Sequence, residues 1–183
     1  MTKKITSLGI DLSLTGTGLV ILENGKIAKQ KLIKSKPTPD GQPIDELKRI
    51  KKIVEEIETI IAENLPNIAI IEGLAFMVRN ATALVQLSAL NYFVRSMLMD
   101  YHVPFVIVAP TSLKKFITGS GISKKDVILI ELYKRYGVSI LNDNEADAYG
   151  LAQVGLALLG GNSKTTTKLQ EEVTSLLKKQ LPK

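Results

Sequence analysis

The sequence predicts an α/β fold built on a mixed five-stranded sheet with helices on both faces, and three features of the chain support this. The chain begins with three short apolar segments, and the last two flank Asn24-Gly25, a pair typical of tight hairpin turns. These segments should form an antiparallel meander. Further on, 67–73 and 103–108 are continuous apolar runs, as expected for strands covered on both faces. Helical patterns alternate with these two runs, which indicates parallel pairing.

The expected elements follow from hydrophobic periodicity and from turn residues. Strands are expected at residues 5–11, 16–22, 27–33, 67–73 and 103–108. Helices are expected at residues 44–64, 80–100, 111–117, 123–136 and 144–159. A loop with three prolines, 34–43, separates the meander from the first helix. One face of this helix is apolar, and we expect the basic face to be solvated; that face carries Lys48, Arg49, Lys51 and Lys52.

Length and composition indicate one globular domain with a short tail. The chain has 183 residues, of which 45% are hydrophobic, and this suffices for one core. We expect the main domain to span 1–160, with a flexible link and a short amphipathic helix in 161–183. No apolar run reaches the roughly 18 residues of a membrane span, and the N-terminus lacks a signal-peptide pattern. The sequence therefore predicts a cytoplasmic protein.

The residue types limit the possible chemistry. The chain has no cysteine and one histidine, which excludes disulfides, thiolate zinc sites and cysteine nucleophiles and leaves little room for a Ser-His-Asp triad. Any metal must therefore be held mainly by oxygen ligands, as magnesium and manganese are. Lys and Arg number 24 against 18 Asp and Glu, and the net charge of +6 is compatible with a polyanionic partner such as nucleic acid.

Two of the expected strands end in a carboxylate, Asp11 and Glu72. In an open α/β sheet the functional crevice lies beyond the carboxyl ends of the central strands, so the two side chains should meet there. Like charges repel unless a cation lies between them, and the pair therefore favours a divalent metal site. Asp147 in the last core helix can supply a third carboxylate, and Asn144 lies one turn earlier on the same helix face.

Four segments of the chain carry a motif pattern. They are LGIDLSLTGTG at 8–18, IAIIEG at 68–73, PTSLKKFITGSGISKKDV at 110–127 and NEADAYGLA at 144–152. In this order they resemble the motifs of the RuvC-type Holliday junction resolvases, within the ribonuclease H-like nuclease superfamily. The resemblance implies a ribonuclease H-like fold and a magnesium-dependent endonuclease that resolves four-way DNA junctions by paired symmetric nicks. The last motif and the lysine-rich tail resemble the phage-carried branch of the family.

The resemblance also assigns catalytic roles. The implied metal ligands are Asp11, Glu72, Asp147 and Asn144. Asn144 stands where many members carry an acid or a histidine, and Asp143 or a water molecule is the alternative ligand. Two magnesium ions, with manganese as a substitute, would activate the attacking water and stabilise the leaving oxygen.

The remaining implied residues contact DNA or a second subunit. Lys114 and Lys125 would act as catalytic cations at phosphates near the scissile bond. The implied DNA-binding set is Phe76, Met77, Arg79, Lys114, Lys115, Lys124 and Lys125. Two symmetric nicks need two equivalent sites, so we expect a homodimer, formed through helix 80–100.

Two other classes of function stay open. The segment GIDLSLTGTG also resembles the first phosphate loop of the actin and sugar-kinase fold, but such proteins need a second half that 183 residues cannot hold. Detectable ATP turnover would favour that reading. A catalytically inert dimer that binds branched DNA is the other alternative, and the neutral Asn144 favours it.

Overall fold

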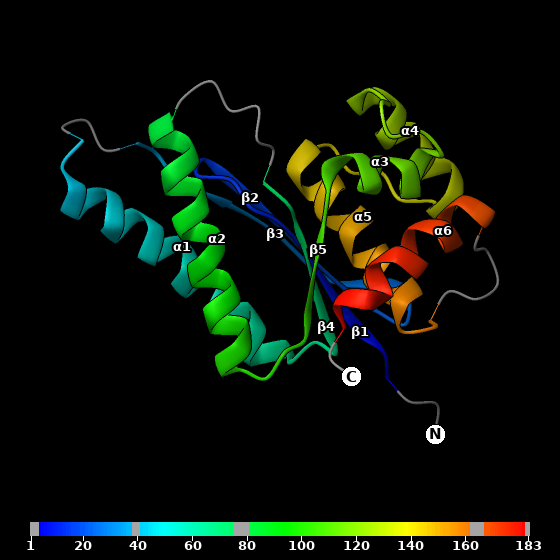
Figure 1. Ribbon diagram of the computed structural model, residues 1–183, viewed down its shortest axis with the longest axis horizontal. Helices are drawn as coiled ribbons and strands as arrows, with labels where there is room; N and C mark the ends of the chain where they lie inside the picture. Colours follow the sequence, from blue (N-terminus) through cyan, green and yellow to red (C-terminus); the bar gives the residue numbers. More distant parts are fainter. Residues whose placement is uncertain (1–3, 38–40, 75–80, 162–166, 182–183) are drawn as a thin grey trace.

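A five-stranded mixed sheet forms the middle layer of the protein (Figure 1). The computed structural model describes residues 4–37, 41–74, 81–161 and 167–181. The strands are β1 (Thr6–Asp11), β2 (Gly16–Glu23), β3 (Lys26–Lys34), β4 (Ile68–Glu72) and β5 (Phe105–Val108). Their order is β3-β2-β1-β4-β5; the β1–β2 and β2–β3 pairs are antiparallel, and the β1–β4 and β4–β5 pairs are parallel. The predicted mixed sheet and its antiparallel meander are confirmed.

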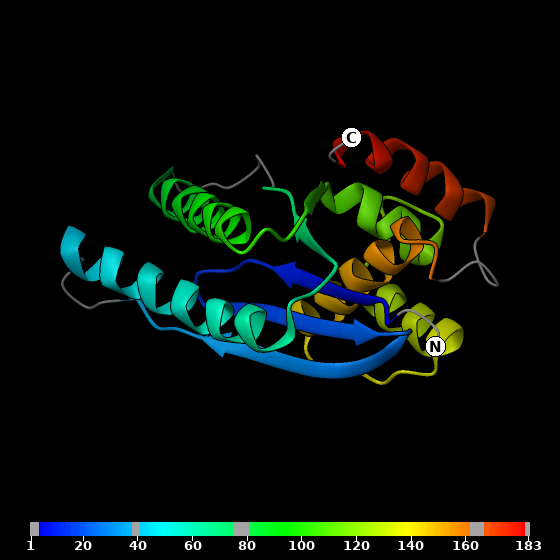
Figure 2. The same cartoon turned by 90° about the horizontal axis from the view of Figure 1, so that it is seen from below.

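Helices cover both faces of this sheet, as predicted (Figures 1 and 2). On one face lie α1 (Pro43–Asn64) and α2 (Ala81–Asp100). The other face carries α3 (Pro110–Thr118), α4 (Lys125–Tyr136), α5 (Asp143–Leu158), α6 (Lys168–Leu177) and the short 3₁₀ helix η1 (Lys178–Gln180). Each face has its own apolar core. Within the described ranges no helix is both long and apolar enough to cross a membrane.

The ends of the elements follow local chemistry. Asn24 and Gly25 have φ values of 49° and 85°, which confirms the predicted hairpin turn. β5 begins at Phe105, two residues after the predicted start, because Pro104 has no N–H to donate to the ladder. α4 begins at Lys125, two residues after its predicted start.

Close contact between α5 and the sheet depends on two glycines. A Cβ on Gly9 of β1 would lie 1.9 Å from the carbonyl oxygen of Ala148, and one on Gly18 of β2 would lie 2.2 Å from that of Asn144. Any side chain at these positions would displace the helix, so glycine lets the two backbones touch. The first turns of α5 are thereby held beside the end of β1.

The C-terminal elements pack onto the same face as α5. Val173 and Leu177 of α6 are buried in that core. The side chain of Gln180 accepts a hydrogen bond from the backbone N–H of Ile107 at 2.9 Å and donates one to its carbonyl oxygen at 3.0 Å. An amide side chain thus pairs with the edge strand β5 as a neighbouring strand would.

Candidate active site

Three carboxyl groups meet at the carboxyl ends of the central strands. Asp11 ends β1, and Glu72 ends β4, its parallel neighbour. Their side chains hydrogen-bond to each other, and Asp11 is only 7% exposed. Asp147, from the second turn of α5, interacts with both through its charge. Sheet register and the glycine contacts of α5 therefore bring together residues that lie far apart in sequence.

The pKa values of these three groups show that nearby positive charge compensates their negative charge only in part. Burial, and next the charge of Asp147, raises the pKa of Asp11 to about 7. Burial, followed by the charges of Asp11 and Asp147, raises the pKa of Glu72 to about 8. Burial also raises the pKa of Asp147 to about 6. Because the pKa of every carboxyl group in the cluster is raised, binding of a cation there would be favourable.

Two lysines lie at the edge of this cluster. The charge of Lys114, on α3, lowers the pKa of Glu72 and of Asp147 against the dominant effect of burial. Lys125, at the start of α4, lies with its Nζ 3.0 Å from Oδ2 of Asp143. This hydrogen bond is the largest cause of the raised pKa of Lys125, and the charges of Asp147 and Asp11 add to it. Both lysines offset part of the negative charge.

Three polar residues at the start of α5 each have a partner. The side chain of Asn142 caps the helix, accepting hydrogen bonds from the backbone N–H groups of Asn144 at 3.0 Å and Glu145 at 3.2 Å. Nδ2 of Asn144 donates to the carbonyl oxygen of Gly16 at 2.5 Å, which ties α5 to the first residue of β2. Asp143 is engaged with Lys125.

The other residues of the predicted DNA-binding set lie outside the carboxyl cluster or outside the described residues. Lys115 forms an ion pair with Glu172 of α6 at 3.0 Å. Lys124 is exposed and directly precedes α4. The predicted junction-facing residues Phe76, Met77 and Arg79 lie outside the described residues.

Sequence reasoning missed Arg49, which was expected to be solvated on the basic face of α1. Its Nε donates to Oγ of Ser35 at 2.6 Å, and its Nη2 donates to the carbonyl oxygen of Leu14. Arg49 therefore holds the β1–β2 loop that follows Asp11. Hydrophobic periodicity cannot reveal such a contact, because it depends on a loop 14 residues away that folds back onto the helix.

The donor set suits a divalent cation. Asp11, Glu72 and Asp147 offer only carboxylate oxygens, which are the ligands that magnesium and manganese prefer. Among the described residues, no group of three His, Cys, Asp or Glu is arranged closely enough to coordinate one ion as it stands. The hydrogen bond between Asp11 and Glu72 turns two of the oxygens toward each other. The residues thus fit a cation by charge and donor type.

The sheet order defines the fold class. A meander followed by parallel strands, with helices on both faces, is a ribonuclease H-like fold, and Thermus thermophilus RuvC shares it with a TM-score of 0.69. The family model described as crossover junction endodeoxyribonuclease RuvC matches residues 7–152. The chain belongs to this family, and the predicted resemblance is confirmed at that level.

Individual relatives agree with the family match. The crossover junction endodeoxyribonuclease RuvC of Carboxydothermus hydrogenoformans is 26% identical over 158 residues, which cover 84% of this chain and 97% of that protein. The same enzyme of Rickettsia bellii is 30% identical over 147 residues, covering 79% and 92%. The structure of Thermus thermophilus RuvC in complex with Holliday junction substrate superimposes with a TM-score of 0.71 at 18% identity, covering 87% and 96%. That likeness supports the fold.

Proposed function

We propose that this chain is a magnesium-dependent endonuclease that resolves four-way DNA junctions by paired symmetric nicks. Its family supplies the reaction class, cleavage of DNA at crossover junctions. The observation that carries the proposal is the meeting of Asp11, Glu72 and Asp147 at the ends of β1 and β4. Lys114 and Lys125 beside them supply the cations that a phosphodiester would need.

Asp11, Glu72 and Asp147 would hold the divalent ions, magnesium first and manganese as a substitute. Bound there, the ions would supply the charge that promotes ionisation of water and stabilises the developing charge on the phosphodiester. The raised pKa values of these three carboxyl groups support this assignment, because added positive charge would return them to the ionised form at neutral pH.

Asn144 is the proposed fourth ligand. Its hydrogen bond to Gly16 uses Nδ2, and Oδ1 is the amide atom that could coordinate an ion. Asp143 or a water molecule is the alternative. The ion pair between Asp143 and Lys125 favours a role for Asp143 in positioning the lysine over a role as metal ligand.

The lysines would bind the substrate and stabilise charge. Lys114 and Lys125 are the proposed catalytic cations, since each already interacts with the carboxyl cluster. Lys124 and Lys115 would contact the backbone further out, and Lys115 would exchange Glu172 for a phosphate. Phe76, Met77 and Arg79 are further proposed junction contacts, by resemblance to the family.

A homodimer through α2 would supply the two equivalent sites that paired nicking needs. Leu90, Val94 and Met97 of this helix are buried in the core of the protomer. A second set of apolar residues on α2 is exposed and supports the proposal: Val85, Tyr92, Phe93 and Met99. We expect sedimentation of the wild type as a dimer and of a Val85→Glu/Met99→Glu variant as a monomer.

We also propose a cellular location and a branch of the family. We place the protein in the cytoplasm, of the host cell if it is phage-encoded. The phage-carried branch is supported by Asn144 in the last motif and by the lysine-rich tail, whereas the relatives named above are bacterial.

The test is incubation of the purified protein with a labelled synthetic four-way junction, with magnesium, with manganese and with a chelator. We expect symmetric nicks in two opposite strands that require the metal and are lost in Asp11→Asn and Glu72→Gln. Both variants keep the shape of the carboxyl group and should still bind the junction.

The opposite result would assign a different function. Tight junction binding without nicks, under magnesium and manganese alike, would make the protein an inert branched-DNA-binding module and overturn the proposal.

A further inference from the structure

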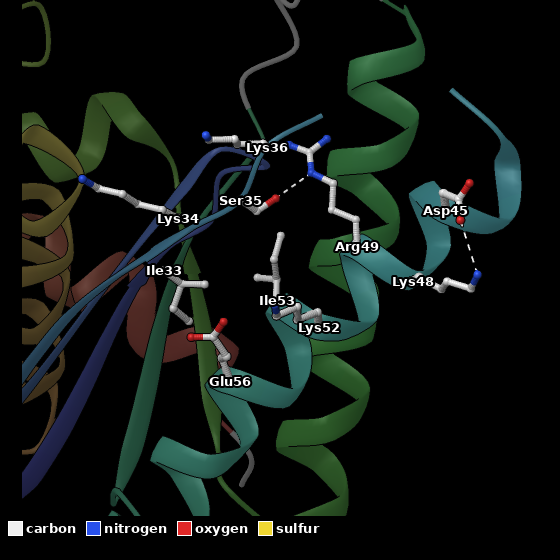
Figure 3. A pocket seen from close by; sticks show the side chains of 10 residues that line it. All are labelled: Ile33, Lys34, Ser35, Lys36, Asp45, Lys48, Arg49, Lys52, Ile53 and Glu56. Carbon is white, nitrogen blue, oxygen red and sulfur yellow. Dashed lines mark hydrogen bonds and ion pairs between the residues drawn. The ribbon is translucent and has the colours of Figure 1, made fainter. Parts of the chain in front are cut away.

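A basic groove lies between the end of β3 and the N-terminal half of α1 (Figure 3). Its volume is about 430 Å³. Five of the residues that line it are basic, Lys34, Lys36, Lys48, Arg49 and Lys52, and two are acidic. We call these five residues the basic groove; none of them belongs to the catalytic or DNA-binding set proposed above.

The acids of the groove leave most of this charge uncompensated. Asp45 forms an ion pair with Lys48 at 3.3 Å, and Glu56 pairs with Lys31, which lies outside the groove, at 2.9 Å. Lys34, Lys36 and Lys52 are exposed, and the described part of the chain offers none of them an ion-pair partner. Exposed cations held close together repel one another, and a bound polyanion would relieve that repulsion.

Arg49 is held in place within the groove without losing its charge. Its two hydrogen bonds go to neutral acceptors, the hydroxyl of Ser35 and the carbonyl oxygen of Leu14, as Figure 3 shows for Ser35. The buried side chains of Ile33 and Ile53 lie against the groove and fix its walls. A guanidinium fixed by neutral partners is pre-organised to bind an anion.

The groove opens at the same end of the sheet as the carboxyl cluster. Asp11 pairs with Gly18 across the β1–β2 ladder, and Gly18 pairs with Leu32 on β3. Two strand spacings of about 4.8 Å therefore separate Asp11 from β3, roughly 10 Å in all. The N–H of Ser35 also donates to the carbonyl oxygen of Thr15 at 3.2 Å, so the loop after Asp11 touches the groove directly.

We propose that the basic groove binds the sugar–phosphate backbone of a DNA arm that leaves the cleavage site. This inference rests on the proposed function. Lys48 and Lys52 lie one turn apart, about 6 Å along the helix axis, which is close to two backbone steps of about 3.4 Å each. The cations extend from the end of β3, where the side chain of Lys34 points away from α1 (Figure 3), to two turns of the helix. Such a spread suits an extended polyanion better than a single phosphate ion.

The test compares two triple variants with the same change in charge. Lys34→Ala/Lys36→Ala/Lys52→Ala empties the groove of its unpaired lysines. Lys26→Ala/Lys168→Ala/Lys179→Ala removes three exposed lysines elsewhere and serves as the control. Affinity for a labelled four-way junction is measured in a chelator, which prevents cutting, over a range of salt concentrations and with long and short arms.

The groove variant should lose about tenfold or more in affinity for the long-armed junction at physiological salt. A plot of log K against log salt has a negative slope, and each lost phosphate contact makes it less steep by about 0.9. For three lost contacts we expect the steepness to decrease by about 2 to 3. The control should keep the wild-type slope. Shortening the arms should weaken the wild type and leave the groove variant nearly unchanged.

Other outcomes would overturn the inference, and they can be told apart from failure of the proposed function. An unchanged slope in the groove variant, while the wild type binds and nicks junctions, contradicts the groove and leaves the function intact. Unchanged DNA binding with loss of inorganic phosphate binding would make it a small-anion site. A wild type that neither binds nor nicks junctions contradicts both.

Discussion

The two faces of the sheet carry opposite charges at the same end. On the α5 face, Asp11, Glu72 and Asp147 are brought together where burial raises the pKa of each. On the α1 face, Lys36, Lys48 and Lys52 of the basic groove stay exposed, and two hydrogen bonds hold Arg49. Buried like charges are costly without a counterion, whereas exposed ones cost little. The buried carboxyl groups of the first face therefore favour a compact cation. The exposed lysines of the second face are stable without a ligand and suit a polyanion.

The two faces also differ in how closely their helices pack near this end of the sheet. α5 touches the backbones of β1 and β2 through Gly9 and Gly18. The N-terminal part of α1 instead leaves Ile44 and Leu47 exposed at 57% and 42%. Chemistry needs the fixed geometry of the first face, while binding along a backbone tolerates the second.

The largest expected effect is a difference in nicking rate between variants of two acids of α5. Asp147→Asn removes a proposed ligand, so nicking should fall by about 10³-fold or more while junction binding persists. Asp143→Asn releases Lys125 and removes a charge that raises the pKa of Asp147, and it should cost about tenfold or less. Single-turnover nicking measures both. Equal losses in the two variants would contradict the assignment of Asp147 to the metal and of Asp143 to positioning.

A smaller effect is expected on the rate–pH profile, and it should differ between variants of two adjacent lysines. Lys125→Ala removes a charge that lowers the pKa of Asp11 and of Asp147, so the acidic limb of the rate–pH profile should move to higher pH. The nicking rate at neutral pH should fall about 10- to 100-fold. Lys124→Ala removes a proposed DNA contact that is not among the causes of these pKa shifts, so it should weaken substrate binding without moving the profile along the pH axis. A profile that does not move in Lys125→Ala would contradict the coupling.

The smallest expected effect concerns stability in a chelator. Asp11 keeps its proton to about pH 7 in the folded chain, against an ordinary pKa of 3.8, so the folded state binds more protons over that range. The free energy of unfolding should therefore fall as pH rises from about 4 to 8, by about 1 to 3 kcal/mol. Denaturant unfolding of the wild type measures this fall.

Two variants sharpen the stability measurement. Glu72→Gln should flatten the pH dependence, because it removes a second carboxyl group whose pKa is raised, to about 8. Glu63→Gln changes an exposed acid on α1 and should not. A wild type whose stability rises over the same pH range would show that the cluster is already compensated.

The sheet and the position of its acids could be predicted because they depend on short-range patterns. Asn24-Gly25 marked the hairpin, continuous apolar runs marked the buried strands, and chain order required parallel pairing for β4 and β5. Strand ends carrying Asp11 and Glu72 then had to lie side by side, because parallel strands end at the same edge.

The remaining features depend on contacts that no local pattern encodes. The engagement of Arg49 with Ser35 and Leu14 depends on how a proline-containing loop returns to the sheet. The use of Asn144 as a tether to Gly16 depends on the distance between α5 and β2, which the glycines set. Spacing could place Asn144 on the right face of the helix, and only the fold shows what its amide touches.

Metal binding by the carboxyl cluster is the central claim, and calorimetric titration with manganese tests it most directly. The wild type should bind the ion and release protons at pH 7, because carboxyl groups with raised pKa values must ionise to coordinate it. Asp11→Asn should lose this binding, and Asp45→Asn, which changes an acid on the opposite face, should keep it. Equal binding by the three proteins, or no binding by the wild type, would contradict the claim.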